Sequence, residues 1–354
     1  MTTGAFWKDR RVFVTGHTGF KGGWLALKLL AAGAKVHGYA LAPPTEPNLF
    51  TVAQVQGGLS GHTIADVRDA DSLLGALKRA NPSVLFHLAA QPLVRESYRD
   101  PVATYAVNVM GTVNLLEAAR STGGIEVIVN VTTDKCYDNK EWAWGYRESE
   151  PLGGRDPYSS SKACAEIVTA AYRDSFLAQA GIRVATARAG NVIGGGDWAH
   201  ERLVPDFFRA ADAGASLEVR YPGATRPWQH VLEPVSGYLA LAEQLVSVGA
   251  DRARAWNFGP ADDDARPVSW ILDRLVARSG ALPWRAAPGH HAHEACYLKL
   301  DSSMAKAELG WRPRWDLENA LEKTVAWHSA WRSGSAMRHE TLRQIAEHDP
   351  AWGV

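Results

Sequence analysis

The feature of this sequence that most constrains its fold is an alternation between short runs rich in β-branched residues and longer stretches with helical apolar spacing. Such alternation predicts parallel strands of one sheet, joined by helices that cover both of its faces. Right-handed crossovers between the strands then give a doubly wound, Rossmann-type α/β fold. The predicted strands are residues 11–15, 35–40, 62–66, 83–90, 126–133 and 183–189, and the clearest predicted helices are residues 21–34, 101–120 and 157–178.

After about residue 190, the alternation gives way to loops rich in Gly, Pro and Trp, such as GGGDW at 194–198. Further helices are predicted near residues 235–248, 268–279, 302–309 and 317–334. We therefore expect residues 1–190 to form the doubly wound domain, with segments near 230–260 interleaved into it. Residues 191–354 are expected to form mainly a smaller mixed lobe.

Charge and composition argue against several other classes of protein. The 354 residues include 38 Lys+Arg and 38 Asp+Glu, so no net field favours nucleic acid or an acidic membrane. No apolar run reaches the length of a membrane span, and the opening MTTGAFWKDRR lacks the apolar core of a signal peptide. The widely spaced Cys136, Cys164 and Cys296 predict neither a disulfide framework nor a metal site, and they fit a reducing cytoplasm.

A glycine-rich turn follows the first predicted strand and opens the first predicted helix. It reads VTGHTGFKG and places Gly16, Gly19 and Gly22 three residues apart. Glycines at such a turn let backbone N–H groups approach a pyrophosphate at the helix N-terminus. The turn therefore predicts a dinucleotide site in the domain of residues 1–190, although a turn needed only for packing is the alternative.

The end of the second predicted strand does not identify the dinucleotide. An NAD site usually has an acid there for the ribose hydroxyls, and an NADP site an Arg nearby. The segment HGYALAPPT has neither, and the first acid is Glu46, so NAD and NADP both stay open on these residues. Asp66, after the third strand, is a candidate for the adenine amine or for a cap on the next helix.

A tyrosine and a lysine lie one helical turn apart in PYSSSKACAE. Residues four apart project from one helix face, so Tyr158 and Lys162 are expected to point the same way. A nearby ammonium group stabilises a phenolate, which lets a tyrosine act as a base near neutral pH. The pair predicts proton transfer in an alcohol–ketone interconversion, whereas in many helices such a pair is only a solvated contact.

Five motifs in order resemble those of the extended short-chain dehydrogenase/reductase family. They are TGHTGFKG, HLAAQ (87–91), VNVMGTVNLLEAAR (107–120), the Thr-Asp at 133–134 and YSSSK (158–162). The resemblance implies that NAD stays bound while a nucleotide sugar is oxidised at C4. It further implies cofactor contacts from Thr18, Phe20, Lys21, Val67, Leu88, Ala89, Ala90, Gln91 and Asn108, besides the glycines, Asp66, Tyr158 and Lys162.

The segment VTTDKCY narrows this resemblance. Nucleotide-sugar 4,6-dehydratases of the family usually carry Thr-Asp-Glu, whereas this chain has Thr133, Asp134 and Lys135. The Asp-Lys variant is similar to the branch that acts on CDP-glucose, which implies a first committed step of deoxysugar synthesis. Other segments share that resemblance: FWKDRRVFVTGHTGFKGGWL, GYALAPPTEPNLF (38–50), GNVIGGGDW (190–198), RPWQHVLEP (226–234) and HEACYLKLD (293–301).

The implied chemistry gives each of these residues a role. Tyr158 removes the C4 hydroxyl proton and Thr133 hydrogen-bonds the C4 oxygen. We hypothesise that Asp134 protonates the leaving C6 oxygen and that Lys135, in its neutral form, takes the C5 proton. The alternative is a Lys135–Asp134 ion pair that only shapes the loop. Neighbours on a strand face opposite ways, so both reach one pocket only if the strand ends there.

Four residues of the second half are candidates for contacts with the substrate. Asn191 follows a predicted strand, and Arg202 and Arg226 are candidate pyrophosphate clamps, although surface ion pairs are the alternative for each Arg. Trp228 is a candidate stacking or packing residue. A metal site is not favoured at the Gly- and Pro-bounded loop, whose candidate ligands are His290, His291, His293 and Glu294.

The residues described so far are compatible with two other functions. A nucleotide-sugar C4 epimerase shares the glycines and the Tyr-Lys pair but loses no water. A non-catalytic dinucleotide sensor of the same fold commonly lacks the Tyr or the Lys, and here both are present. The family resemblance also implies a homodimer through a four-helix bundle of the helices near 101–120 and 157–178, with a tetramer as the alternative.

Overall fold

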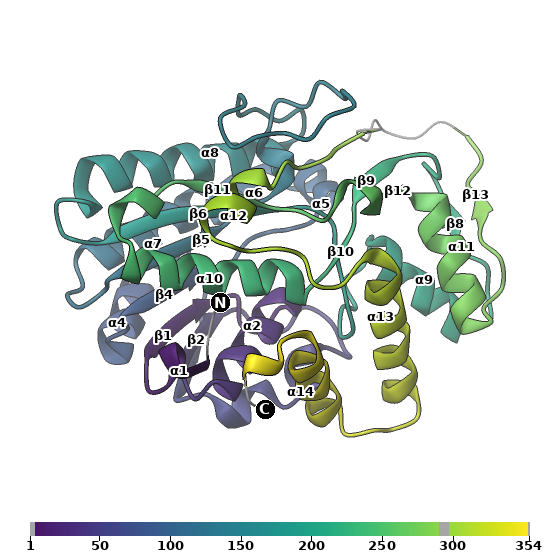
Figure 1. Cartoon of the computed structure of the whole chain (residues 1–354), viewed down its shortest axis with the longest axis horizontal. Coiled ribbons are helices and arrows are strands. Elements are labelled where there is room, and N and C mark those ends of the chain that lie inside the picture. Colours follow the sequence, from purple (N-terminus) through teal and green to yellow (C-terminus); the bar gives the residue numbers. More distant parts are fainter. Residues whose placement is uncertain (1–3, 290–296, 353–354) are drawn as a thin grey trace.

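A seven-stranded parallel sheet forms the centre of the computed structural model, which describes residues 4–289 and 297–352 (Figure 1). Its strand order is β11-β6-β5-β4-β1-β2-β3. The predicted doubly wound α/β fold is thereby confirmed, and the segment near 255–258 joins its edge. The strands are β1 Arg11–Thr15, β2 Lys35–Ala40, β3 Gly61–Ile64, β4 Val84–His87, β5 Val127–Val131, β6 Arg183–Ala189 and β11 Ala255–Phe258.

Helices cover both faces of the sheet (Figure 1). On one face, α2 (Phe20–Ala31) and α10 (Leu232–Ser247) pack on Val12, Val14 and their neighbours. On the other face, α4 (Ala70–Ala80) and α7 (Gly111–Arg120) pack on Phe13, Leu85 and Ile128, with α8 (Pro157–Tyr172) alongside α7. Burial on both faces explains why these strands are continuous apolar runs in the sequence.

The two long predicted helices each contain one π-helical turn. The stretch predicted at 101–120 comprises α6 (Pro101–Tyr105), η2 (Ala106–Met110) and then α7. The stretch predicted at 157–178 comprises α8 followed by η4 (Arg173–Leu177). Both predictions are confirmed in position, and the altered hydrogen-bond spacing within them is the difference that the structure adds.

The smaller lobe has a core of its own, at the right of Figure 1. Helices α9, α11 and α13 pack there around Phe207, Trp228 and Leu321. Their bounds are α9 Leu203–Asp212, α11 Val268–Ser279 and α13 Leu317–Arg332, and the short strands are β7 Val192–Ile193, β8 Glu218–Val219, β9 Thr225–Pro227, β10 Gln229–His230, β12 Ala265–Pro267 and β13 Arg285–Ala286. The remaining elements are α1 Gly4–Trp7, α3 Leu49–Val52, α5 Val94–Arg99, α12 Ser303–Glu308, α14 Met337–His348, η1 Val55–Gly58, η3 Asp134–Cys136, η5 Ala250–Arg252, η6 Asp262–Asp264 and η7 Pro350–Trp352.

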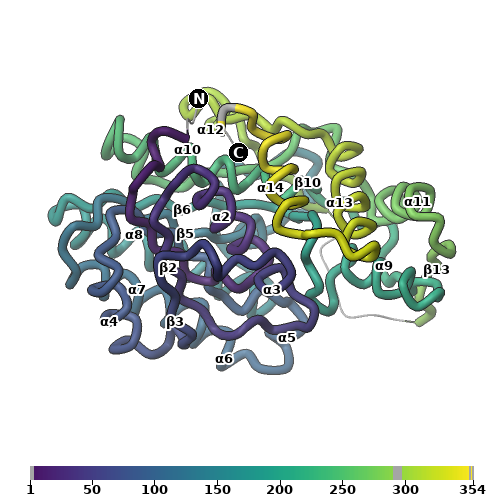
Figure 2. The backbone as a smooth tube through the Cα atoms, turned by 90° about the horizontal axis from the view of Figure 1, so that it is seen from below, coloured from purple at the N-terminus to yellow at the C-terminus, as the bar shows by residue number. Residues whose placement is uncertain are grey.

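The end of the described chain returns to the first domain. Figure 2 shows α14 beside α2, and the two helices are in contact. Lys28 on α2 and Asp349 form an ion pair at 3.5 Å, and both side chains are fully buried. In the part of the chain that the structure describes, no helix has the length and apolar character to cross a bilayer.

The GGGDW loop joins the two lobes through tryptophans. The Trp24 indole N–H, on α2, donates to the Gly195 carbonyl at 2.9 Å. On the other side of the loop, a Cβ placed on Gly195 would lie 2.0 Å from Cγ of Trp327, on α13. The absence of a side chain at Gly195 therefore lets helices of both lobes close on one backbone position.

We predict that Gly195→Ala destabilises the protein by about 1–3 kcal/mol, because overpacking forces buried rings to shift. The matched control is Gly123→Ala, where an added Cβ meets nothing within 4 Å. The control should change the free energy of unfolding by less than about 0.5 kcal/mol. Urea denaturation measures both, and equal effects of the two substitutions would contradict close packing at Gly195.

Candidate active site

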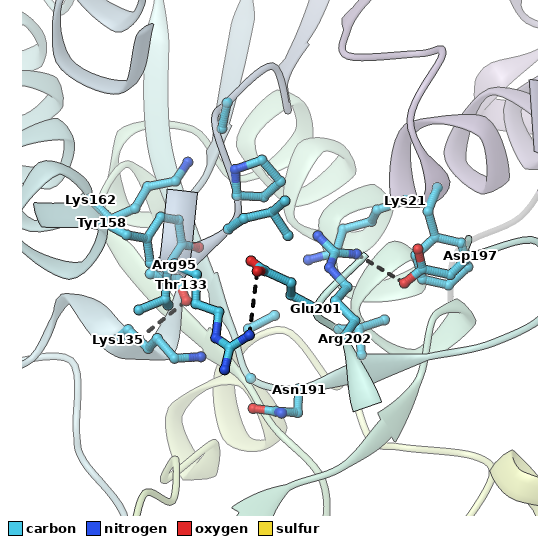
Figure 3. Close-up of a pocket in the computed structure, with 18 of the residues that line it drawn as sticks. Lys21, Arg95, Thr133, Lys135, Tyr158, Lys162, Asn191, Asp197, Glu201 and Arg202 are labelled. Atoms are coloured by element: carbon cyan, nitrogen blue, oxygen red, sulfur yellow. Dashed lines mark hydrogen bonds and ion pairs between the residues drawn. The ribbon is translucent and has the colours of Figure 1, made fainter. Parts of the chain in front are cut away.

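A cavity of about 870 Å³ lies at the carboxyl ends of the central strands, between the two lobes (Figure 3). It opens beside β1 and β4, where the strand order of the sheet reverses direction. Open α/β sheets bind ligands at such a switch point. The volume is near the upper end of the range for ligand pockets, which suits an extended ligand or two ligands together.

The glycine turn forms one wall of this cavity. Gly16 has a φ of +76°, and a Cβ on Gly22 would lie only 2.1 Å from the Gly16 carbonyl oxygen. Helix α2 then starts at Phe20 without a side-chain N-cap. Backbone N–H groups at an uncapped helix start suit the pyrophosphate of a dinucleotide, so the turn fits the predicted cofactor.

Most of the residues predicted to contact the cofactor line the cavity. They are Gly16, Thr18, Gly19, Phe20, Lys21, Gly22, Asp66, Val67, Leu88, Ala89, Ala90, Tyr158 and Lys162. Gln91 and Asn108 are not among the lining residues. The Asn108 side chain is buried and bonds the backbone N–H and carbonyl of Gln91, so this pair supports the loop behind the cavity wall.

Asp66 lines the cavity and does not cap the following helix. The cap of α4 is Asp69, whose side chain accepts from Ser72, so the capping alternative for Asp66 is wrong. The Asp66 carboxylate instead accepts from the backbone and guanidinium of Arg68. Those hydrogen bonds from Arg68 lower the pKa of Asp66 and keep a carboxylate at this wall.

Tyr158 and Lys162 are both buried and both face the cavity from α8 (Figure 3). Burial raises the pKa of Tyr158 to about 12, and a hydrogen bond with Thr133 opposes that shift. Burial also lowers the pKa of Lys162 to about 8, against the attraction of Glu166. The Lys162 ammonium donates to the Val131 carbonyl at 3.4 Å, which directs it to the end of β5.

Asp134 and Lys135 reach the same cavity because the backbone turns there. Strand β5 ends at Val131, and the 3-10 turn η3 begins at Asp134. Thr133 caps that turn: its hydroxyl donates to the Asp134 carboxylate at 3.0 Å and accepts from the Lys135 N–H. Asp134 is buried, and its Oδ2 has no hydrogen-bond partner within the described residues.

The ion-pair alternative for Lys135 does not hold in this structure. Asp134 and Lys135 are both described, and no ion pair links their side chains. Figure 3 shows the Lys135 side chain extending into the cavity below Thr133. The half-buried Lys135 side chain is therefore placed to meet a ligand.

Positive charge accumulates on the opposite wall. Lys21 donates to the Tyr238 hydroxyl at 3.4 Å. Removal from water lowers the pKa of Lys21 to about 7, and the cations of Arg202 and Lys162 lower it further. The cavity thus combines several basic side chains with the carboxyl group of Asp134, and the basic side chains suit an anionic ligand.

The four predicted substrate residues all line the cavity but differ in their partners. Asn191 has a buried Oδ1 with no partner in the described structure, which suits a ligand contact. Arg202 already pairs with Asp197 at 2.9 Å. Trp228 is buried in the core of the smaller lobe, and its indole N–H donates to the Arg266 carbonyl. This environment favours the packing role for Trp228. Arg226 is also buried.

Several cavity residues were not predicted from the sequence. Arg95 on α5 pairs with Glu201, before α9, at 3.4 Å and so crosses the cavity between the lobes (Figure 3). In the sequence, only the position of Arg95 shortly after the fourth strand could have indicated a role in the site. Helix α5 follows the carboxyl end of β4, and ligands bind at that end of the strands in such sheets. The other unpredicted lining residues include Tyr98, Asp197, Arg220 and Tyr221.

No cluster of three potential metal ligands occurs among the residues that the structure describes. The His-rich loop considered in the sequence, with His290, His291, His293 and Glu294, lies outside the described residues.

Comparison with known proteins agrees with this geometry. Residues 12–259 match the model of the NAD dependent epimerase/dehydratase family. A CDP-glucose 4,6-dehydratase from Salmonella typhimurium is 50% identical over 349 residues, which cover 97% of each chain. A UDP-glucose 4-epimerase from Mycolicibacterium smegmatis is 30% identical, with 89% of this chain and 97% of that protein covered.

Solved structures show the same fold. A UDP-glucose 4-epimerase from Thermus thermophilus in complex with NAD superposes with a TM-score of 0.78 at 26% identity, covering 89% of this chain and 98% of that one. An epimerase from Methanothermobacter thermautotrophicus has a TM-score of 0.81 at 21% identity, covering 95% and 96%.

We predict that Gly22→Ala weakens NAD binding about 5- to 150-fold, because a Cβ in the turn costs about 1–3 kcal/mol through strain or displacement of the turn. Calorimetric titration with NAD measures this. Gly57→Ala, where an added Cβ meets nothing within 4 Å, is the control and should bind NAD as the wild type does. Unchanged affinity in Gly22→Ala would show that the turn does not hold the cofactor.

Proposed function

The chain belongs to the NAD dependent epimerase/dehydratase family, and on that premise we propose that it is a CDP-glucose 4,6-dehydratase. This hydro-lyase converts CDP-glucose into CDP-4-keto-6-deoxyglucose. The observation that carries the proposal is the identity of 50% over 97% of the chain to a protein of that name. The arrangement of Thr133, Asp134 and Lys135 beside the Tyr158–Lys162 pair supports it.

The two parts of the chain divide the ligands between them. Residues 1–190, with the segments near 230–260, hold the dinucleotide through the glycine turn and the ends of the parallel strands. Residues 191–354 mainly hold the nucleotide sugar, since Asn191, Arg202 and Arg226 line the cavity from that side. The guanidinium groups meet the pyrophosphate, and Trp228 closes the wall behind them.

Bound NAD supplies the hydride acceptor for C4 and the hydride donor for C6. Tyr158 takes the proton of the C4 hydroxyl at its phenolic oxygen. Lys162, one turn along α8, stabilises the phenolate with its charge. The hydrogen bond with Thr133 and the charge of Arg202 oppose the rise in pKa that burial causes at Tyr158. The Thr133 hydroxyl lies beside Tyr158 and holds the C4 oxygen as it becomes a carbonyl.

Asp134 and Lys135, in the turn after β5, carry out the elimination of water. The C4 ketone acidifies the C5 proton, and neutral Lys135 takes that proton. Protonated Asp134 donates to the C6 oxygen, so that the C5–H and C6–O bonds break and one water leaves. The Asp134 Oδ2 without a protein partner is the atom available for this donation. Lys135 then returns its proton to C5 as C6 is reduced. The proton that Tyr158 took from the C4 hydroxyl balances the one that Asp134 gave to the leaving water, so both groups regain their starting states.

Neither rival function, the C4 epimerase or the dinucleotide sensor, requires the side chains of Asp134 and Lys135. A C4 epimerase needs the glycine turn and the Tyr158–Lys162 pair, but it has no step that requires an acid and a base at the end of β5. A non-catalytic dinucleotide sensor needs none of these side chains, whereas here Tyr158, Lys162, Asp134 and Lys135 all face one cavity.

The function is tested by incubating the purified protein with NAD and, separately, CDP-, dTDP-, UDP- and GDP-glucose, followed by mass spectrometry. Loss of one water from CDP-glucose alone is expected. Water loss from another sugar nucleotide would keep the chemistry and replace the substrate. An isobaric product would identify an epimerase, and an unchanged mass in every mixture would contradict the proposal.

Lys135→Ala should still reduce the bound cofactor with CDP-glucose but should eliminate water at least about 100-fold more slowly, because it lacks the base. Absorbance of the reduced nicotinamide follows the first step and mass spectrometry the second. The control is Lys140→Ala, an exposed lysine that pairs with Asp138 and does not line the cavity. Dehydration by Lys135→Ala at the wild-type rate would remove Lys135 from the mechanism.

An exposed apolar surface on the two long helices supports a homodimer. Val102 and Met110 lie on α6 and η2, and Ile167 and Phe176 lie on the neighbouring α8 and η4, all of them exposed in the single chain. Two copies would bury these residues in a four-helix bundle, and a tetramer is the alternative assembly.

The free thiols of Cys136 and Cys164 agree with an enzyme that works in a reducing cytoplasm.

We predict that the double substitution Val102→Asp, Ile167→Asp converts the dimer into a monomer, because four buried carboxylates would face each other without partners. Size-exclusion chromatography with light scattering measures the mass. Leu282→Asp, at an exposed apolar residue of the other lobe, is the control and should leave the dimer intact. A wild-type protein that runs as a monomer would contradict the assembly.

A further inference from the structure

A buried carboxylate lies on α8 just beyond the reacting pair. Tyr158, Lys162 and Glu166 follow one another at intervals of four residues and so lie along one helix face. Tyr158 and Lys162 line the cavity, but Glu166 is buried and does not. Its position makes Glu166 part of the support for the site rather than a residue that contacts substrate.

Both oxygens of Glu166 are fully used by side chains from two strands. Oε1 accepts a hydrogen bond from the Thr132 hydroxyl. Oε2 accepts from the Thr186 hydroxyl at 2.6 Å and from the Arg188 guanidinium at 2.8 Å. Thr132 directly follows β5, whereas Thr186 and Arg188 lie on β6. One carboxylate therefore links a helix to the residue that follows β5 and to two residues of the neighbouring β6.

This contact is polar where a doubly wound sheet normally packs apolar side chains. In the β5–β6 ladder, Asn130 pairs with Thr186, and Asn130 also donates to Thr169 of α8 at 2.8 Å. A buried ion pair adds little to stability once its desolvation is counted. Directional hydrogen bonds instead restrict sliding of α8 along the strands, which interchangeable apolar contacts would allow.

The register of α8 on β5 matters because the reacting groups come from these two elements. Tyr158 and Lys162 are on α8, whereas Thr133, Asp134 and Lys135 belong to the turn that follows β5. Small misplacements of reacting groups reduce rates strongly. Thr132 is the residue directly before that turn, so its bond to Glu166 joins the two sets of groups.

We propose that Glu166 is a positioning residue that, through Thr132, holds the turn of residues 133–135 in register with Tyr158 and Lys162. The catalytic consequence rests on the proposed dehydratase function. The inference goes further by assigning a role to a side chain that contacts neither ligand. A simpler role, in which Glu166 only neutralises the buried Arg188, requires the bond from Arg188 but not the bond from Thr132.

The two threonines separate these roles, because each donates one hydroxyl to the same carboxylate. Thr132→Val removes the link to the catalytic turn and keeps the shape of the side chain. Thr186→Val removes an equivalent donor from β6 and is the matched control. Both keep the Glu166–Arg188 pair, so neither leaves a buried charge unpaired. Thr132→Ser restores the hydroxyl in the first position.

Hydrogen–deuterium exchange tests the positioning without any substrate. Peptides that cover residues 132–138 should exchange at least about tenfold faster in Thr132→Val, because the turn opens more often. Thr186→Val and Thr132→Ser should exchange as the wild type does. Equal exchange in all four proteins, or equal acceleration in both valine variants, would overturn the inference.

Activity then tests the catalytic consequence. With CDP-glucose, Thr132→Val should lower kcat for water loss at least about tenfold with little change in KM. The substitution displaces the turn of residues 133–135 and leaves the residues that bind the substrate in place. Thr186→Val should keep the wild-type kcat, and Thr132→Ser should recover most of it. Equal losses in both valine variants would overturn the inference. A wild-type protein that leaves CDP-glucose unchanged would reject the proposed function, while hydrogen exchange would still decide the positioning.

Discussion

Burial of the parallel sheet on both faces is the constraint on which the rest of this structure depends. Apolar side chains of the central strands are covered by α2 and α10 on one side and by α4 and α7 on the other. Chemistry can therefore occur only where the strands end. The carboxyl ends of β1, β4, β5 and β6 meet at one edge, and the second lobe closes over that edge to form the cavity.

The site also shows how a fold can place charge in a poorly hydrated region. Lys21 and Lys162 face the cavity, and burial lowers the pKa of each, to about 7 and about 8. At the cavity, Arg202 and Arg95 already pair with acids that also line it, whereas Oδ2 of Asp134 has no partner within the described residues. Behind the cavity, Glu166 and Arg188 form a buried ion pair with each other. Glu166 also accepts a hydrogen bond from Thr186, and Arg188 also donates one to Tyr137.

Much of the first domain could be predicted, because its signals are local. The apolar runs at 11–15, 35–40 and 183–189 became strands with those same bounds. Helix α14 was missed because MRHETLRQIAEH has little apolar periodicity and is held by packing against α2 and α13. Helix α9 was missed because Pro205 lies in its first turn, where a proline is tolerated but reads as a break.

The sequence by itself determined the glycine turn, the Tyr158–Lys162 spacing and the Thr-Asp-Lys segment, because each depends on residues at most a few positions apart. Only the tertiary structure decided that Asp134 and Lys135 share a cavity, that Arg95 meets Glu201 across it, and that Glu166 finds its partners. Thr132 and Thr186 are 34 and 20 positions from Glu166 along the chain. Burial and charge act through space, so these relations arise only when the whole sheet and both lobes have assembled.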